Sequence, residues 1–362
     1  MLHTDRRYLA NREVRTDDAA TARYELARSG FLSAIMLRIE CTNGATAGEE
    51  LLFDAIDRVE VVGDGSDILF SLEGRELYKW NWAWLRRRPP HLRTQAVSGV
   101  QEITLVIPFG RFIGDPLANL DLSRHNRVEL TIEYSPTISA TAFTTGTFTI
   151  TAIEYSWRAI NPPPGRLGFL RTRQIRAFTS VASGDEVVEL DRAFPYTGIL
   201  VYAREAAIAD GTDITIVELR EDAGRVIPYT GRWLDIQMEN EVELDLDAYE
   251  EGIALQADNG TIDTLLSRIL SAEIMLVQDY TADAAGTGQI AIASITADRI
   301  TIASIDEDFT AAAPVSALNT ARETIHFRAR GIGIGNAVLV PLAHMGDLEH
   351  PYVAPSKDTD EL

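Results

Sequence analysis

Cysteine and lysine are the residues that this sequence has least of. Cys41 is the only cysteine among 362 residues, which excludes an intrachain disulfide and a metal site built from cysteines. Lys79 and Lys357 are the only lysines, so arginine carries almost all of the positive charge. We therefore expect packing and assembly, rather than cross-links, to stabilise the protein.

Long apolar runs are also missing. No window holds about 18 uninterrupted apolar residues, the length that a membrane-spanning helix needs. Residues 1–25 are charged and lack the apolar core of a signal peptide. We therefore expect neither a membrane span nor secretion by that route.

Positive charge is scarce in the chain as a whole. The formal net charge is −21 and the isoelectric point is near 4.7. Binding to the phosphates of nucleic acid needs clustered lysine and arginine. Direct nucleic-acid binding by the folded body is therefore not expected.

The sequence is rich in short alternating segments, which are typical of half-buried strands. In residues 126–135, Val128, Leu130 and Ile132 fall on one face and polar residues on the other. Other predicted strands lie at 31–41, 57–63, 67–72, 101–109, 147–157, 186–191, 198–205, 213–221, 232–238, 271–280, 289–295, 299–305 and 324–332. The pattern predicts an all-β fold, with residues 259–270 as the best candidate for a short helix.

Three consecutive prolines, Pro162 to Pro164, can continue neither a helix nor a central strand. We predict a linker at 161–172 between a first barrel at 29–160 and a second at 173–345, each with about eight strands. Residues 1–28 are predicted to form an N-terminal arm and residues 346–362 an acidic C-terminal tail. We also predict an internal duplication, because similar strands open at Gly30 and Gly198.

A cluster of tryptophans precedes an arginine run. Trp80, Trp82 and Trp84 alternate, so on a strand they would share one face. Packing in the core or between subunits is the favoured interpretation, and a sugar-stacking platform is the alternative. The run that follows, Arg86, Arg87 and Arg88, is expected to meet an acidic neighbour across a subunit contact.

No catalytic, cofactor-binding or metal site is predicted. Gly331, Gly333 and Gly335 lack the spacing of a dinucleotide-binding loop and are expected to make bends or close contacts in a late strand. The six histidines show no pair at metal-ligand spacing.

Two groups of polar residues have simple structural explanations. Glu241, Glu243, Asp245 and Asp247 alternate with apolar residues and are interpreted as the solvated face of a strand rather than a calcium site. The nearest approach to a catalytic cluster is formed by Asp121, Ser123 and His125, which are interpreted as polar turn residues.

Several segments of the first 160 residues follow one another in a characteristic order. They are residues 28–32 at the entry to a strand, 61–67 with 68–77, 107–111, and 120–122 shortly before the strand at 126–135. In order and spacing these segments resemble the double-jelly-roll major capsid proteins of the tectivirus and adenovirus lineage. The second half departs more from that pattern and is similar in strand content and length.

The resemblance implies a structural protein with two consecutive jelly-roll barrels and short helices in loops, with neither a cofactor nor enzymatic activity. Three copies would form a pseudo-hexagonal capsomer that tiles an icosahedral virion shell. The implied partners are the homotrimer itself, neighbouring capsomers, vertex or minor capsid proteins and an internal membrane surface. Two other classes compete: a viral attachment or carbohydrate-binding β-sandwich protein, and a β-sandwich hydrolase, which would need paired carboxylates in a cleft.

Overall fold

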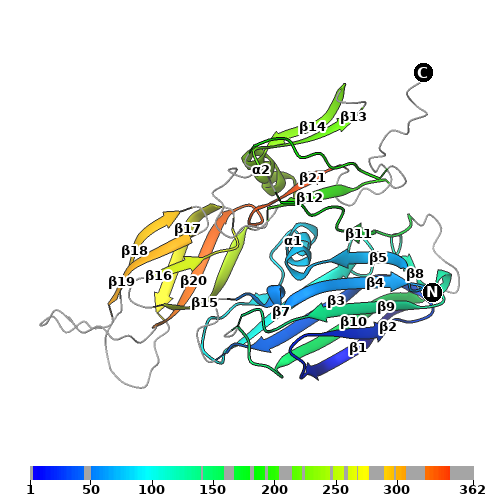
Figure 1. The fold of residues 1–362 in the computed structure, drawn as a ribbon, viewed down its shortest axis with the longest axis horizontal. Coiled ribbons are helices and arrows are strands. Elements are labelled where there is room, and N and C mark those ends of the chain that lie inside the picture. The colour runs from blue at the N-terminus through cyan, green and yellow to red at the C-terminus, as the bar shows by residue number, and fades with distance from the viewer. Residues whose placement is uncertain are drawn as a thin grey trace, which may run out of the picture.

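The computed structural model describes residues 3–44, 50–139, 142–158, 167–179, 183–191, 195–203, 214–221, 225–244, 248–256, 260–266, 268–276, 289–296, 299–306 and 323–342. These residues are mainly β-strands, with two α-helices of 12 residues, α1 (Gly74–Leu85) and α2 (Trp233–Leu244). The predicted all-β class is confirmed (Figure 1).

The first half forms a complete jelly roll. Its strands are β1 (His3–Arg15), β2 (Ala20–Glu25), β3 (Phe31–Thr42), β4 (Ile56–Gly63), β5 (Asp67–Leu72), β7 (Val100–Pro108), β9 (Val128–Tyr134) and β10 (Phe148–Arg158). One sheet has the order β1-β10-β3-β7 and the other has β5-β4-β9-β2. The short strands β6 (His91–Leu92), β8 (Leu120–Asp121) and β11 (Thr172–Arg173) extend these sheets. We call this unit the first roll.

Alternation places the core between the two sheets. In β9 the buried positions are Val128, Leu130, Ile132 and Tyr134, as the sequence pattern predicts. The ring of Tyr134 stacks on that of Phe148 across the sheets, with centroids 4.6 Å apart. Burial of such apolar surface is the main stabilising contribution to the roll.

The predicted N-terminal arm is wrong for residues 3–25. β1 pairs with β10, and β2 pairs with β9, so both strands are integral to the first roll. They lie at sheet edges and show charged residues to solvent, because only one face of an edge strand needs to be apolar. Their composition therefore resembles that of a solvated arm.

The predicted linker is only partly described. Residues 161–166 lie outside the described residues, whereas residues 167–173 follow the first roll. The Leu170 amide donates to the Phe109 carbonyl at 2.9 Å, and β11 pairs in parallel with β5. The described part of this segment therefore packs on the first roll instead of separating it from the second half.

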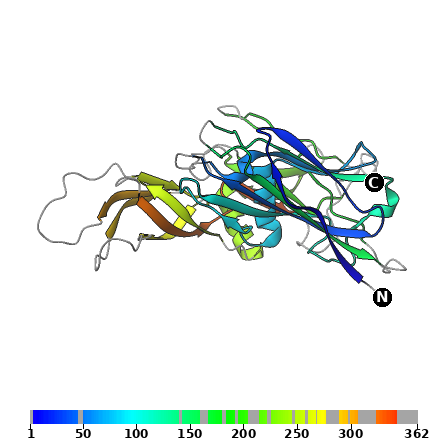
Figure 2. The same cartoon turned by 90° about the horizontal axis from the view of Figure 1, so that it is seen from below.

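A six-stranded sandwich lies in the second half. Its strands are β15 (Tyr249–Gln256), β16 (Gly260–Asp263), β17 (Arg268–Leu276), β18 (Gln289–Thr296), β19 (Arg299–Asp306) and β20 (Glu323–Ile332). The sheet orders are β15-β20-β17 and β16-β19-β18. The first of these sheets has the same strand order as β1-β10-β3 of the first roll, and the second has the same order as β2-β9-β4. The sandwich therefore follows the jelly-roll order, but its described residues include no strands that correspond to β5 and β7. It projects to one side of the first roll (Figure 2).

The helix predicted at 259–270 is wrong, because residues 260–263 and 268–270 belong to strands. Ile262, Leu266 and Ile269 do have the spacing of a helix face, and all three are buried. Pairing of β16 with β19 and of β17 with β20 overrides this local pattern.

The remaining elements form what we call the second unit. They are β12 (Gly198–Tyr202), the hairpin β13 (Ile216–Glu221) and β14 (Val226–Arg232), helix α2, and β21 (Ala337–Pro341), which pairs with β12. The strand predicted at 232–238 is wrong, since α2 begins at Trp233. The strand predicted at 186–191 is also wrong, because these residues belong to no sheet.

The second unit repeats a portion of the first roll. In both, a hairpin leads into a 12-residue helix whose eighth residue is a buried asparagine, Asn81 or Asn240. The Asn81 side chain accepts from the Val106 amide and donates to the Val106 carbonyl; Asn240 does the same with Leu339. In each case the bonded residue stands two positions before a proline, Pro108 or Pro341.

Strand register supports the predicted duplication but corrects its alignment. Ala34 of β3 pairs with Pro108, and Gly198 of β12 pairs with Pro341. Gly198 therefore corresponds to Ala34 and not to Gly30. The two copies share main-chain pairing and one asparagine but little sequence. Sequence similarity alone therefore aligned Gly198 with Gly30, four residues before its true counterpart Ala34.

Candidate functional site

The tryptophan cluster lies on α1 rather than on a strand. The side chains of Glu73 and Glu76 form a capping box at the helix start, which favours a helix over a strand. Successive helix positions are about 100° apart, so Trp80, Trp82 and Trp84 cannot share one face. The strand prediction and the flat sugar-stacking platform built on it are both wrong.

The three tryptophans have different environments. Trp82 is fully buried and packs edge-on against Tyr78, with ring centroids 6.0 Å apart. Trp80 is half-buried against the same core, and Trp84 is also half-buried. In this chain Trp82 is therefore a core residue of the first roll.

The arginine run is divided between surface and interior. Arg86 ends α1 in the left-handed conformation, with φ of 57°, and both Arg86 and Arg87 are exposed. The Arg88 guanidinium instead donates to the Glu251 carbonyl at 3.1 Å and to the Tyr78 hydroxyl. Arg88 thus meets the second half of its own chain.

A second arginine reinforces this junction between the first roll and the sandwich. Arg93 forms a buried ion pair with Glu250 at 2.6 Å, and Glu250 also accepts from the Leu265 amide. The Ile253 amide donates to the Arg93 carbonyl, and the Gln95 amide donates to the Ile253 carbonyl. The loop after β6 therefore continues the sandwich as an added edge segment.

Lys79 is a third cation that joins the first roll to the second half of the chain. Its ammonium, on α1, donates to the carbonyls of Ile334 and Gly335 at 3.0 and 2.7 Å, and it lies near the ring of Tyr202 on β12. Burial, together with the nearby positive charge of Arg75, lowers the pKa of Lys79 to about 7. One helix of the first roll is thus held against the second unit through main-chain acceptors.

Gly335 shows why glycines occur beside this lysine. It has a φ of 46°, and a β-carbon there would lie 1.9 Å from the Leu265 carbonyl oxygen and 2.5 Å from the Lys79 ammonium. Gly333 also has a positive φ, of 78°. The prediction that these glycines make bends and close contacts is confirmed.

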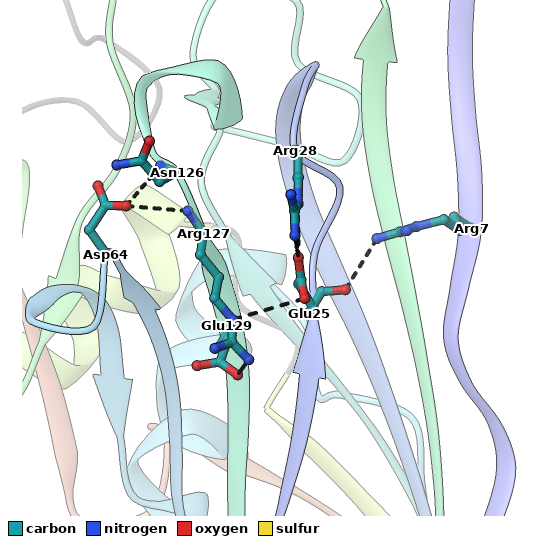
Figure 3. Close-up of polar contacts among 7 residues, drawn as sticks. All are labelled: Arg7, Glu25, Arg28, Asp64, Asn126, Arg127 and Glu129. Atoms are coloured by element: carbon teal, nitrogen blue, oxygen red, sulfur yellow. Dashed lines mark hydrogen bonds and ion pairs between the residues drawn. The ribbon is translucent and has the colours of Figure 1, made fainter.

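The polar end of the first roll, drawn in Figure 3, is a network of hydrogen bonds and ion pairs. Asp64 accepts from the amides of Asn126 and Arg127, and Arg127 forms an ion pair with Glu129. Figure 3 also shows Glu25 between Arg28 and Arg127. These contacts tie the β4–β5 turn and β2 to β9.

The Asp121, Ser123 and His125 group does not form a catalytic cluster. Asp121 accepts from the amide and hydroxyl of Ser123 and caps a short 3-10 helix, Leu122–Arg124. The His125 ring is directed at Asp64, at 3.3 Å. These are turn contacts, as the sequence predicts.

Two of the four acidic residues predicted to line a strand, Glu241 and Glu243, lie on helix α2 instead. Asp245 and Asp247 are outside the described residues. Across the described ranges, no group of three or more His, Cys, Asp or Glu side chains could hold a metal ion. None of the helices that the structure describes is long and apolar enough to cross a membrane.

Comparison with known proteins first identifies the class of fold, a double jelly roll of the kind found in viral capsids. No family model and no curated protein sequence matches this chain. Solved structures do match this chain. The major capsid protein of STIV has a TM-score of 0.50 and 10% identity over 92% of this chain and 98% of that one. A chain of the atomic structure of Sulfolobus turreted icosahedral virus has a TM-score of 0.50 and 13% identity over 92% of this chain and 91% of that one. The predicted double-jelly-roll fold is thus confirmed.

Proposed function

We propose that this chain is a major capsid protein, a structural subunit that forms homotrimeric capsomers in an icosahedral virion shell. The observation that supports this most directly is the shared fold with a viral major capsid protein over nearly the whole of both chains. The contacts that Lys79, Arg88 and Arg93 make with the second half of the chain suit the role, because a shell subunit must present both halves in one fixed orientation.

The proposed role involves no catalytic step and no cofactor. Neighbouring capsomers are the proposed partners, together with vertex or minor capsid proteins and an internal membrane surface. The net charge of −21 favours protein contacts over binding of the genome by the folded body. Of the arginine run, Arg86 and Arg87 remain candidates for contacts between subunits, since they are exposed.

The test is to express the full chain and determine its mass in solution by light scattering, followed by electron microscopy of concentrated material. We expect trimers with a pseudo-hexagonal outline and, at higher concentration, sheets or shells. A chain that stays monomeric at every concentration and salt condition would contradict the proposal.

A further inference from the structure

Helix α2 presents an apolar stripe to solvent. Leu234, Met238 and Val242 are spaced by four residues, so they lie along one helix face. They are 39%, 57% and 85% exposed. The other face of the helix buries Trp233 and Ile236 in the second unit. We call the three exposed residues the α2 stripe.

The same helix positions in α1 are covered. Because Asn81 and Asn240 are both the eighth residue of their helix and make the same contacts, the two helices align position by position. The second, sixth and tenth residues of α1 are Arg75, Lys79 and Ala83. Lys79 is 4% exposed and Ala83 is fully buried.

The second unit contributes the cover over this face of α1. Lys79 donates to the Ile334 and Gly335 carbonyls just before β21, and Arg75 interacts with the side chain of Tyr202 on β12. Figure 1 shows α1 between the strands of the first roll and the β12–β21 pair. The helix of the first roll thus uses this face to hold the following unit.

The repeat indicates what covers the α2 stripe. Exposed apolar side chains gathered on one face mark interaction surfaces, and here they stand out against a chain of net charge −21. The α1 face is covered by the next repeat in the chain, whereas the described residues contain no third such repeat. We propose that the α2 stripe docks onto the first roll of a second copy of this chain. This inference rests on the proposed function and names the surface by which subunits associate.

Strand register identifies the region that receives the stripe. With Pro341 aligned to Pro108, Gly335 corresponds to Glu102 and Tyr202 to Arg38. Arg38 and Glu102 form an ion pair on the outer face of the first roll. Beside them Leu92 and Val100 are 53% and 47% exposed, so this region offers apolar surface to the stripe.

The contact is head to tail, because a surface of the second unit meets a different surface of the first roll. Contacts of this type close into rings when the rotation between copies permits it and otherwise form open chains. A closed trimer, with each copy contributing two similar units, would place six comparable contacts around the ring, three within chains and three between them.

Charge substitution in the stripe tests the inference. Met238→Glu and Val242→Glu are introduced separately into the full chain, and subunit association is followed by light scattering and native mass spectrometry. We expect each variant to weaken association by at least about tenfold, which is the effect of about 1.4 kcal/mol, while its circular dichroism is unchanged. Val187→Glu is the matched control, because Val187 is 70% exposed and lies outside α2; it should associate like the wild type.

Directed cross-linking gives a second measurement that does not depend on the charged variants. One chain carries Met238→Cys and another carries Val100→Cys; the native Cys41 is buried and should not react. Mixing and mild oxidation should produce a disulfide between the two chains, whereas Val187→Cys in place of Met238→Cys should not.

The outcomes separate this inference from the proposed function. The α2 contact would be overturned if the wild type and both charged variants form trimers and the cysteine variants give no cross-link. The proposed capsid role would then still stand. A wild type that never associates would overturn both.

Discussion

At the scale of single residues, Lys79 shows how a scarce residue type can hold a specific position. A buried ammonium loses its hydration, and only part of that loss is recovered from two carbonyl acceptors. Burial accordingly lowers its pKa to about 7 from an ordinary value of 10.5. The junction is therefore held by a group whose charge depends on pH.

This leads to a prediction for stability against pH. Between about pH 7 and 10.5 the unfolded chain keeps the Lys79 proton that the folded chain has released, so the free energy of unfolding should rise with pH in that interval. Chemical denaturation of the wild type and of Lys79→Met at pH 6 and pH 9 measures this. We expect the wild type to gain stability relative to Lys79→Met at the higher pH. A difference between the two proteins that is the same at both pH values would refute the assignment.

At the scale of elements, the two asparagines explain how helices and strand edges are joined. Val106 and Leu339 each turn their amide and carbonyl away from the paired strand, and one asparagine side chain satisfies both groups. An unpaired edge is a liability in a β protein, because it can pair with other chains. The helix thus completes the edge of its sheet.

Removal of either asparagine should be costly. Asn81→Ala and Asn240→Ala each delete two hydrogen bonds and leave a buried amide and carbonyl without partners, so we expect a loss of about 2 to 4 kcal/mol in the free energy of unfolding. Asn11→Ala, at an exposed position of β1, is the control and should change it by less than about 0.5 kcal/mol. Equal effects of Asn11→Ala and Asn81→Ala in denaturant titrations would show that the buried pairs contribute nothing specific.

At the scale of the whole molecule, net charge and association oppose each other. Each chain carries a formal charge of −21, so identical copies repel over a Debye length that falls from about 30 Å at 0.01 M salt to about 10 Å at 0.1 M. An apolar contact such as the α2 stripe is not weakened by this screening. Salt should therefore favour assembly of this protein.

The corresponding experiment is sedimentation velocity of the wild type at about 0.01 M and 0.3 M sodium chloride. We expect the trimer to dominate at the higher salt concentration and to dissociate partly at the lower salt concentration, because screening by salt reduces repulsion between the acidic surfaces. The opposite trend would mean that pairs of opposite charge, and not apolar surface, hold the subunits together.

The sequence alone was enough to predict the strands that bury one face. The segments predicted at 31–41, 57–63 and 299–305 correspond to β3, β4 and β19, since alternation of apolar and polar residues is imposed locally by the pleat. It also determined that no cysteine cross-link is available, and its first 160 residues were sufficient for the resemblance on which the fold prediction rested.

The remaining features follow from contacts between distant parts of the chain. β1 and β2 were predicted as an arm because strands at an edge need few apolar residues. The tryptophan segment was predicted as a strand from its period-two spacing alone, whereas it forms a helix with a capping box at its start. The role of Asn81 and Asn240, and the junction of Lys79 with Gly335, depend on residues 25 or more positions apart meeting through main-chain groups. Main-chain donors and acceptors are the same at every residue, so the sequence carries no mark of which of them will meet.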